Sequence, residues 1–96
     1  MNKVELAFSK KAAIDRGTWF LLRKDDAVDF IVECQKASIE ILGIDGFYKI
    51  DEVTIQPSME HSIDYSLEPT QNVHEKAIKF LKAMPDNLFF EIVCAQ

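Results

Sequence analysis

Apolar residues recur at the spacing of an α-helix in two segments of the chain. In the first segment the apolar positions are three or four residues apart and share one face: Ala27, Phe30, Ile31, Cys34 and Ala37. This spacing predicts an amphipathic helix that runs to about Ser38. The helix is expected to begin at Asp25 or Asp26, because carboxylates suit the positive end of the helix dipole.

The second helical stripe lies near the C-terminal end of the chain. Its apolar positions are Val73, Ala77, Phe80 and Met84, and its lysines, Lys76, Lys79 and Lys82, fall on the opposite side. The helix is expected to begin either at Pro69–Thr70 or at Asn72, which has a glutamate three residues later. Pro85 ends it, because proline cannot continue a helix.

Shorter stretches alternate between apolar and polar residues, which is typical of strands. The extended stretches expected from this pattern are residues 3–8, 18–22, 39–42, 47–50, 53–56, 63–65 and 88–94. Residues 9–16 are expected to form a short helical turn, and a glycine-containing turn is expected at 43–46. Pro57 either ends the stretch before it or places that stretch at a sheet edge. The last strand is apolar on both faces, which indicates a buried position.

The order strand, helix, several strands, helix, strand predicts an α+β (α/β) fold. The expected architecture is a mixed, largely antiparallel sheet with two amphipathic helices packed on it. A chain of 96 residues suits a single domain, residues 1–96, whose core needs no metal or disulfide. The 48% apolar and 28% charged residues are ordinary for a globular chain and argue against disorder.

The chain is expected to stay in the cytoplasm and to hold no cofactor or metal. Its apolar runs are only a few residues long, whereas a membrane span needs about 20. Glu5 stands where the apolar region of a signal peptide would begin. Cys34 and Cys94 are too few and too far apart for a disulfide scaffold or a zinc site. Both are therefore expected to be reduced core residues.

The sequence lacks the short motifs that identify common enzymes. It has no glycine-rich phosphate loop, no nucleophile elbow and no paired histidines at metal spacing. His61 and Asp64 are the best acid–base pair, but a strand would turn them to opposite faces. His74 is expected at the surface, and Trp19 is expected to anchor the core. We expect no enzymatic activity, and a small enzyme that uses His61 is the less favoured alternative.

Negative charge is concentrated in the middle of the chain. Residues 44–75 carry seven acidic side chains against Lys49, a net charge of −6, whereas residues 1–43 are balanced. An acidic field repels nucleic acid and anionic membranes and attracts basic partners, and tyrosine is enriched at binding hot spots. The acids could also serve only to solubilise an exposed loop region. The candidate partner-binding residues are Asp45, Tyr48, Asp51, Glu52, Glu60, His61, Asp64, Tyr65 and Glu68.

Three segments together resemble a known family. Residues 17–22 read Gly-Thr-Trp-Phe-Leu-Leu, residues 39–48 read Ile-Glu-Ile-Leu-Gly-Ile-Asp-Gly-Phe-Tyr, and residues 57–60 begin with proline. With the two helices, this arrangement over about residues 8–84 resembles small bacterial immunity proteins of polymorphic toxin and contact-dependent growth inhibition systems.

The resemblance implies a protein that binds and neutralises a cognate toxin. Many such toxins are nucleases with basic clefts, which suit the acidic residues above as charge partners and Tyr48 and Tyr65 as anchors. The expected partner is therefore a protein, and neither nucleic acid nor a membrane is expected to bind directly. The alternative is another acidic protein-binding module, such as an antitoxin, a nucleic-acid mimic or a subunit of a complex.

Overall fold

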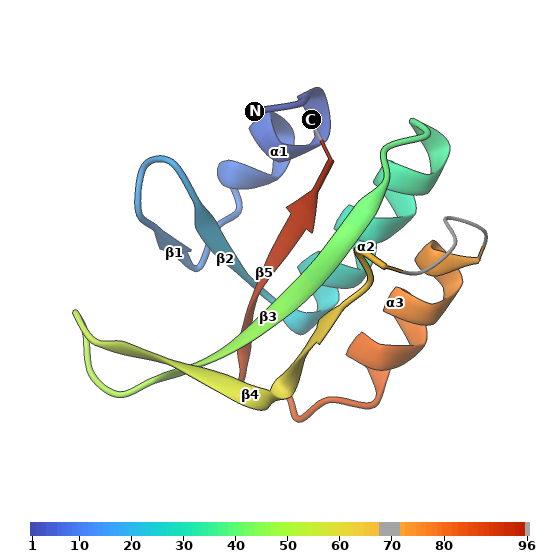
Figure 1. The fold of residues 1–96 in the computed structure, drawn as a ribbon. Coiled ribbons are helices and arrows are strands. Elements are labelled where there is room, and N and C mark those ends of the chain that lie inside the picture. Colours follow the sequence, from blue (N-terminus) through green and yellow to red (C-terminus); the bar gives the residue numbers. More distant parts are fainter. Residues whose placement is uncertain (68–71, 96) are drawn as a thin grey trace.

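The computed structural model describes residues 1–67 and 72–95 as three helices and one five-stranded sheet (Figure 1). The elements are α1 (Lys3–Ser9), β1 (Ile14–Asp15), β2 (Phe20–Arg23), α2 (Lys24–Lys36), β3 (Ile41–Lys49), β4 (Ile55–Asp64), α3 (Val73–Lys82) and β5 (Phe89–Cys94). The strand order is β1-β2-β5-β3-β4, and all neighbours are antiparallel. The predicted α+β fold is confirmed, and β5 occupies the central position that its apolar faces predict.

The helices lie on one side of the sheet (Figure 1). Helix α2 contacts β2, β5 and both of the other helices, and α3 also contacts β3. The hairpin of β3 and β4 extends past the end of β5, since β3 pairs with β5 only as far as Phe47 but with β4 as far as Lys49. Within the described ranges no helix covers the opposite face of the sheet, which we call the open face (Figure 1).

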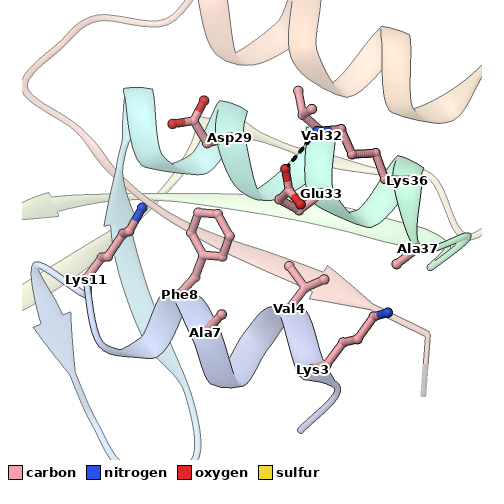
Figure 2. Close-up of a pocket in the computed structure, with 10 residues that line it drawn as sticks. All are labelled: Lys3, Val4, Ala7, Phe8, Lys11, Asp29, Val32, Glu33, Lys36 and Ala37. Atoms are coloured by element: carbon pink, nitrogen blue, oxygen red, sulfur yellow. Dashed lines mark hydrogen bonds and ion pairs between the residues drawn. The ribbon is translucent and has the colours of Figure 1, made fainter.

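Helix α1 replaces the strand expected at residues 3–8. Asn2 and Glu5 cap one another, the Glu5 amide donating to Asn2 Oδ1 (2.8 Å) and the Asn2 amide to Glu5 Oε1 (2.9 Å). Val4 and Phe8, four residues apart, are buried and point toward α2 (Figure 2), whereas Leu6 is 56% exposed. Val4 and Phe8, which the strand prediction placed on one face of a strand, also share one face of a helix. The capping box of Asn2 and Glu5 favours the helix. The helical turn expected at 9–16 does not form as a separate element, because α1 ends at Ser9 and β1 occupies Ile14–Asp15.

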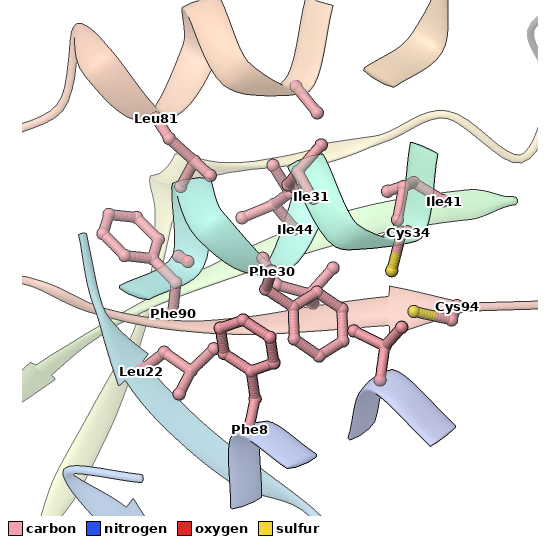
Figure 3. Packing of buried hydrophobic residues seen from close by; sticks show 14 of the residues in the cluster. Phe8, Leu22, Phe30, Ile31, Cys34, Ile41, Ile44, Leu81, Phe90 and Cys94 are labelled. Atoms are coloured by element: carbon pink, nitrogen blue, oxygen red, sulfur yellow. The ribbon is translucent and has the colours of Figure 1, made fainter. Parts of the chain in front are cut away.

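The core lies between α1, α2, α3 and the covered face of the sheet (Figure 3). Phe30 of α2 is 1% exposed and meets Phe8 and Phe20 edge-on, with ring centroids 5.3 and 6.4 Å away. Cys34 and Cys94 are buried in this core as expected, and their sulfurs point toward one another in Figure 3.

Strand β3 runs without interruption through the turn expected at residues 43–46. Its two glycines serve close packing against β4 instead of a change of direction. A Cβ on Gly43 would lie 2.9 Å from the carbonyl oxygen of Ile63, and one on Gly46 would overlap that of His61. Glycine is therefore required by the approach of the neighbouring backbone.

Strand β4 joins the two short strands that the sequence predicts at 53–56 and 63–65. Pro57 does not end the strand, because β4 is an edge strand and needs no further partner for its backbone. The two predicted parts are separated by a bulge in which Asp45 alone on β3 stands opposite residues 59–62. Ser62 fixes the bulge: its Oγ donates to the Ser58 carbonyl (2.7 Å) and accepts from the Gly46 amide (3.0 Å).

The two predicted amphipathic helices are confirmed as α2 and α3. The predicted start of α2 at Asp25 or Asp26 is wrong, because Arg23 is the N-cap and Lys24 is the first residue of the helix. Asp25 and Asp26 follow in its first turn. Asn72 is the N-cap of α3, with a left-handed backbone (φ 69°) and no side-chain capping bond, and the alternative start at Pro69–Thr70 lies outside the described residues. None of the described helices is long and apolar enough to cross a membrane.

We expect Phe30→Ala to lower the free energy of unfolding by about 3–5 kcal/mol, because it removes a buried ring and leaves a cavity between three elements. Urea unfolding followed by circular dichroism measures the loss. Leu67→Ala is the control, since Leu67 is 98% exposed and its change should stay within about 0.5 kcal/mol. Equal effects of the two substitutions would contradict this account of the core.

Candidate functional site

The open face carries a small apolar cluster of its own. Leu21, Phe47 and Phe89 are buried there, although they point away from the helices. They are covered by partly buried side chains of the two hairpins, Ile14, Trp19 and Ile55. The hairpins also meet at their tips, where Arg16 Nη2 donates to the carbonyl of Val53 (3.1 Å). The two hairpins, β1–β2 and β3–β4, therefore border this apolar cluster and contact one another at their tips.

Two carboxylates stand opposite one another in the middle of this face. Asp45 of β3 pairs with Glu91 of β5, and both share the face of Phe47 and Phe89, their neighbours two residues along each strand. Both side chains are half-buried. Like charges directly opposite in a sheet destabilise it. The pair therefore opposes folding at neutral pH.

Further carboxylates near the pair add to the negative potential at Asp45 and Glu91. Burial raises the pKa of Asp45, and the negative charge of Asp64 raises it further. Burial likewise raises the pKa of Glu91, with additional contributions from Asp45 and Glu5. Among the residues that the structure describes, no lysine, arginine or histidine forms an ion pair with Asp45 or Glu91. We call Asp45, Asp64 and Glu91 the acidic row.

An apolar groove of about 470 Å³ begins at Glu91. Trp19 and Phe47 form its aromatic part, with stacked rings whose centroids are 6.0 Å apart. Ile55 and Pro57 line the β4 side. Arg16 lines the groove as well. At its Glu91 end the groove combines a carboxylate with aromatic and aliphatic surface, a combination suited to a long cationic side chain.

A second groove of about 500 Å³ lies at the other end of the acidic row. Asp45 and Asp64 both line it, together with Val93. Met59, in the bulge of β4, forms part of its rim and is 84% exposed. Methionine is enriched in the cores of protein interfaces. The acidic row thus lies between two recesses that are each partly apolar.

The best arrangement for acid–base chemistry lies in the bulge of β4. Ser58 Oγ is 2.7 Å from His61 Nδ1, and the Tyr48 hydroxyl is 3.5 Å from the same nitrogen. Asp64 does not orient His61, because its carboxylate accepts from the Ser66 amide (2.8 Å), and hydrogen bonds from Ser66 lower the pKa of Asp64. Within residues 1–67 and 72–95, no carboxylate is hydrogen-bonded to His61 as the orienting third group of a catalytic triad would be.

Helices α1 and α2 enclose another groove, of about 580 Å³ (Figure 2). Its floor is apolar, and its rim mixes lysines with Asp29 and Glu33. Lys36 on this rim is already paired with Glu33 at 3.3 Å. The groove therefore has no excess of one charge comparable to that of the acidic row.

The described residues hold no cluster of histidine, cysteine and carboxylate groups suited to a metal ion. The buried Cys34 thiol is poorly suited to nucleophilic chemistry. A hydrogen bond with Cys94 raises the pKa of the Cys34 thiol, and burial raises it further, so Cys34 stays protonated at neutral pH.

The residues predicted to bind a partner do not form one site. Asp45 and Asp64 lie together on the open face, whereas Tyr48 packs against His61. Asp51 and Glu52 lie between β3 and β4 and Glu60 in the bulge, all exposed. Glu68 lies outside the described residues. The prediction for Tyr65 is wrong, because its side chain is buried in the core at 3% exposure and presents no ring to a partner.

Glu91 was not among the predicted binding residues, and Trp19 does not anchor the main core as expected. Trp19 is only partly buried, and it belongs to the cluster on the open face. Glu91 was missed because the charge count singled out residues 44–75, and β5 lies outside that segment. The available signal was its position as the one charged residue within an otherwise apolar strand, Phe89–Cys94.

Comparison with known proteins does not extend these observations: no protein family, curated protein or solved structure matches the chain.

The raised pKa values of Asp45 and Glu91 predict a specific pH dependence of stability. The folded state binds protons at these two carboxylates more tightly than the unfolded state does, so protonation stabilises the fold. This contribution to the free energy of unfolding is full below pH about 4 and is lost as the pH rises through the raised pKa values. Asp45→Asn or Glu91→Gln should therefore raise the free energy of unfolding at pH 7, by about 0.5–1 kcal/mol. At pH 4 each variant should match the wild type. Urea unfolding at both pH values measures the difference.

Asp51→Asn is the control for this prediction. Hydrogen bonds from the backbone amides of Val53 and Thr54 (2.9 Å each) help to lower the pKa of Asp51, so its contribution is present at pH 7 and lost in acid. This variant should be destabilised at pH 7, opposite in sign to the other two. If Asp45→Asn and Glu91→Gln also destabilise at pH 7, the acidic row is not repulsive.

Proposed function

We propose that this chain is an immunity protein that binds a basic protein toxin through the open face of its sheet. The observation that carries the proposal is the opposed pair Asp45 and Glu91, half-buried and in no ion pair with a described residue, beside an aromatic groove. In this proposal the chain acts by binding in the cytoplasm and catalyses no reaction. The toxin identity rests on the sequence resemblance, whereas basic-partner binding rests on the geometry.

The electrostatics of the acidic row support a basic partner. Asp45 and Glu91 repel one another in the free chain, and both carboxylates lie where solvent screens them less than at an exposed surface. A partner's arginine or lysine would remove that repulsion on binding. The repulsion between Asp45 and Glu91 destabilises the free chain. Because the partner's cation would cancel this repulsion, the complex is favoured over the free chain.

The adjoining apolar surface supports a protein as the partner. Trp19 and Met59 offer the aromatic and thioether groups that are enriched at the centres of protein interfaces. A nucleic acid is disfavoured, because its phosphates would meet the acidic row directly. A toxin that is itself a nuclease has a basic cleft for those phosphates, and the acidic row would complement such a cleft.

The proposal is tested by co-expression with the product of the neighbouring reading frame. The wild-type chain should restore growth and form a complex whose Kd increases with salt. The double variant Asp45→Asn/Glu91→Gln should weaken binding by about 2 kcal/mol, or roughly 30-fold, and reduce rescue. Calorimetry at 50 and 300 mM NaCl measures the Kd of the wild-type chain and of the double variant at each salt concentration.

Glu75→Gln is the matched control, because Glu75 belongs to the same acidic segment but is exposed on α3, in the helix layer. It should change Kd less than twofold. Wild-type affinity in the double variant would overturn the role of the open face. A tight complex without growth rescue would replace the toxin with another partner, such as the other subunit of a larger assembly.

A further inference from the structure

Glu91 lies where the sheet is incomplete. Strand β2 pairs with β5 only at Leu22 and Arg23, and then departs toward β1. Beside Glu91 this leaves a narrow crevice, lined also by Trp19 and Glu5, that adjoins the apolar groove. Glu91 and Trp19 line both hollows. The carboxylate can therefore be approached along the tryptophan and not only from above the sheet.

The groove has opposite charges in different parts. Arg16, its cation, is engaged with the Val53 carbonyl between the hairpin tips. The charged groups that shift the pKa of Glu91 are carboxylates, Asp45 and Glu5, and Arg16 is not among them. A bound cation would therefore avoid the hairpin tips and move toward β5.

We infer that the groove receives an arginine side chain of the protein partner, its guanidinium beside Glu91 and Asp45. The inference rests on the proposed function and names the group that the acidic row binds. The aliphatic stem would lie along Phe47, Ile55 and Pro57, the apolar lining of the groove. The guanidinium plane would lie against Trp19, which borders the carboxylate.

Two features favour arginine over lysine. The first is the pair of neighbouring carboxylates, whose oxygens can accept several bonds from the planar fork of a guanidinium. The second is the aromatic wall, because guanidinium stacks on indole and is more weakly hydrated than ammonium. The ammonium group of a lysine is more strongly hydrated, and it has fewer N–H donors for the oxygens of the two carboxylates.

The single tryptophan of the chain makes the inference measurable, because Trp19 reports on the groove directly. N-acetyl-L-argininamide should change Trp19 fluorescence and the indole N–H chemical shift saturably, with a Kd in the millimolar range. N-acetyl-L-lysinamide should bind about fivefold more weakly. Glu91→Gln should abolish the preference for arginine, whereas Glu75→Gln should keep it. Circular dichroism and thermal unfolding verify that both variants are folded.

The outcomes separate this inference from the proposed function. Equal responses to the two amides, or an arginine response that survives Glu91→Gln, would overturn the arginine site. Binding of the toxin could still depend on Asp45 and Glu91 in that case, and the proposed function would stand. Conversely, an arginine preference at Trp19 with a toxin complex unaffected by those substitutions would retain the site and refute the proposed function.

Discussion

Strand β5 connects the two halves of the sheet, since it pairs with β2 on one side and β3 on the other. Its alternate residues point to opposite faces, so the strand also determines what each face contains. Phe90, Ile92 and Cys94 complete the core beneath the helices. The residues between them necessarily face away from the helices, and one of these is Glu91.

The register of β5 therefore determines the charge on the open face. A slip by one residue would bring Glu91 into the core and expose Phe90, which is prohibitive because an unpaired buried carboxylate costs several kcal/mol. The same constraint keeps Glu91 opposite Asp45, however unfavourable their repulsion. Burial of the helix-facing side is the larger effect, and it maintains a charge arrangement that the open face alone would not favour.

Much of the fold is predictable because the two longer helices and β5 have unambiguous patterns. The errors arise where a pattern fits two structures. Val4 and Phe8 satisfy both a strand and a helix, and only the contact between Asn2 and Glu5 distinguishes them. Gly46 looks like a turn residue in the sequence. Glycine is needed there because the backbone of β4, distant in sequence, leaves no room for a Cβ atom. Counting charges along the chain likewise identifies Asp45 but not Glu91. The two residues become neighbours only when β3 and β5 pair, and charge counts do not reveal that pairing.

The groove beside Glu91 limits which groups can pair with the acidic row. Arg16 reaches the Val53 carbonyl between the hairpins, Trp19 stacks on Phe47, and Glu91 lines the same groove as these two rings. A group that binds in this groove meets apolar surface and a half-buried carboxylate together. A flexible side chain that carries its charge at the end of an aliphatic stem can satisfy both requirements. The shape of the groove and its charge thus select for the same kind of group, for independent physical reasons.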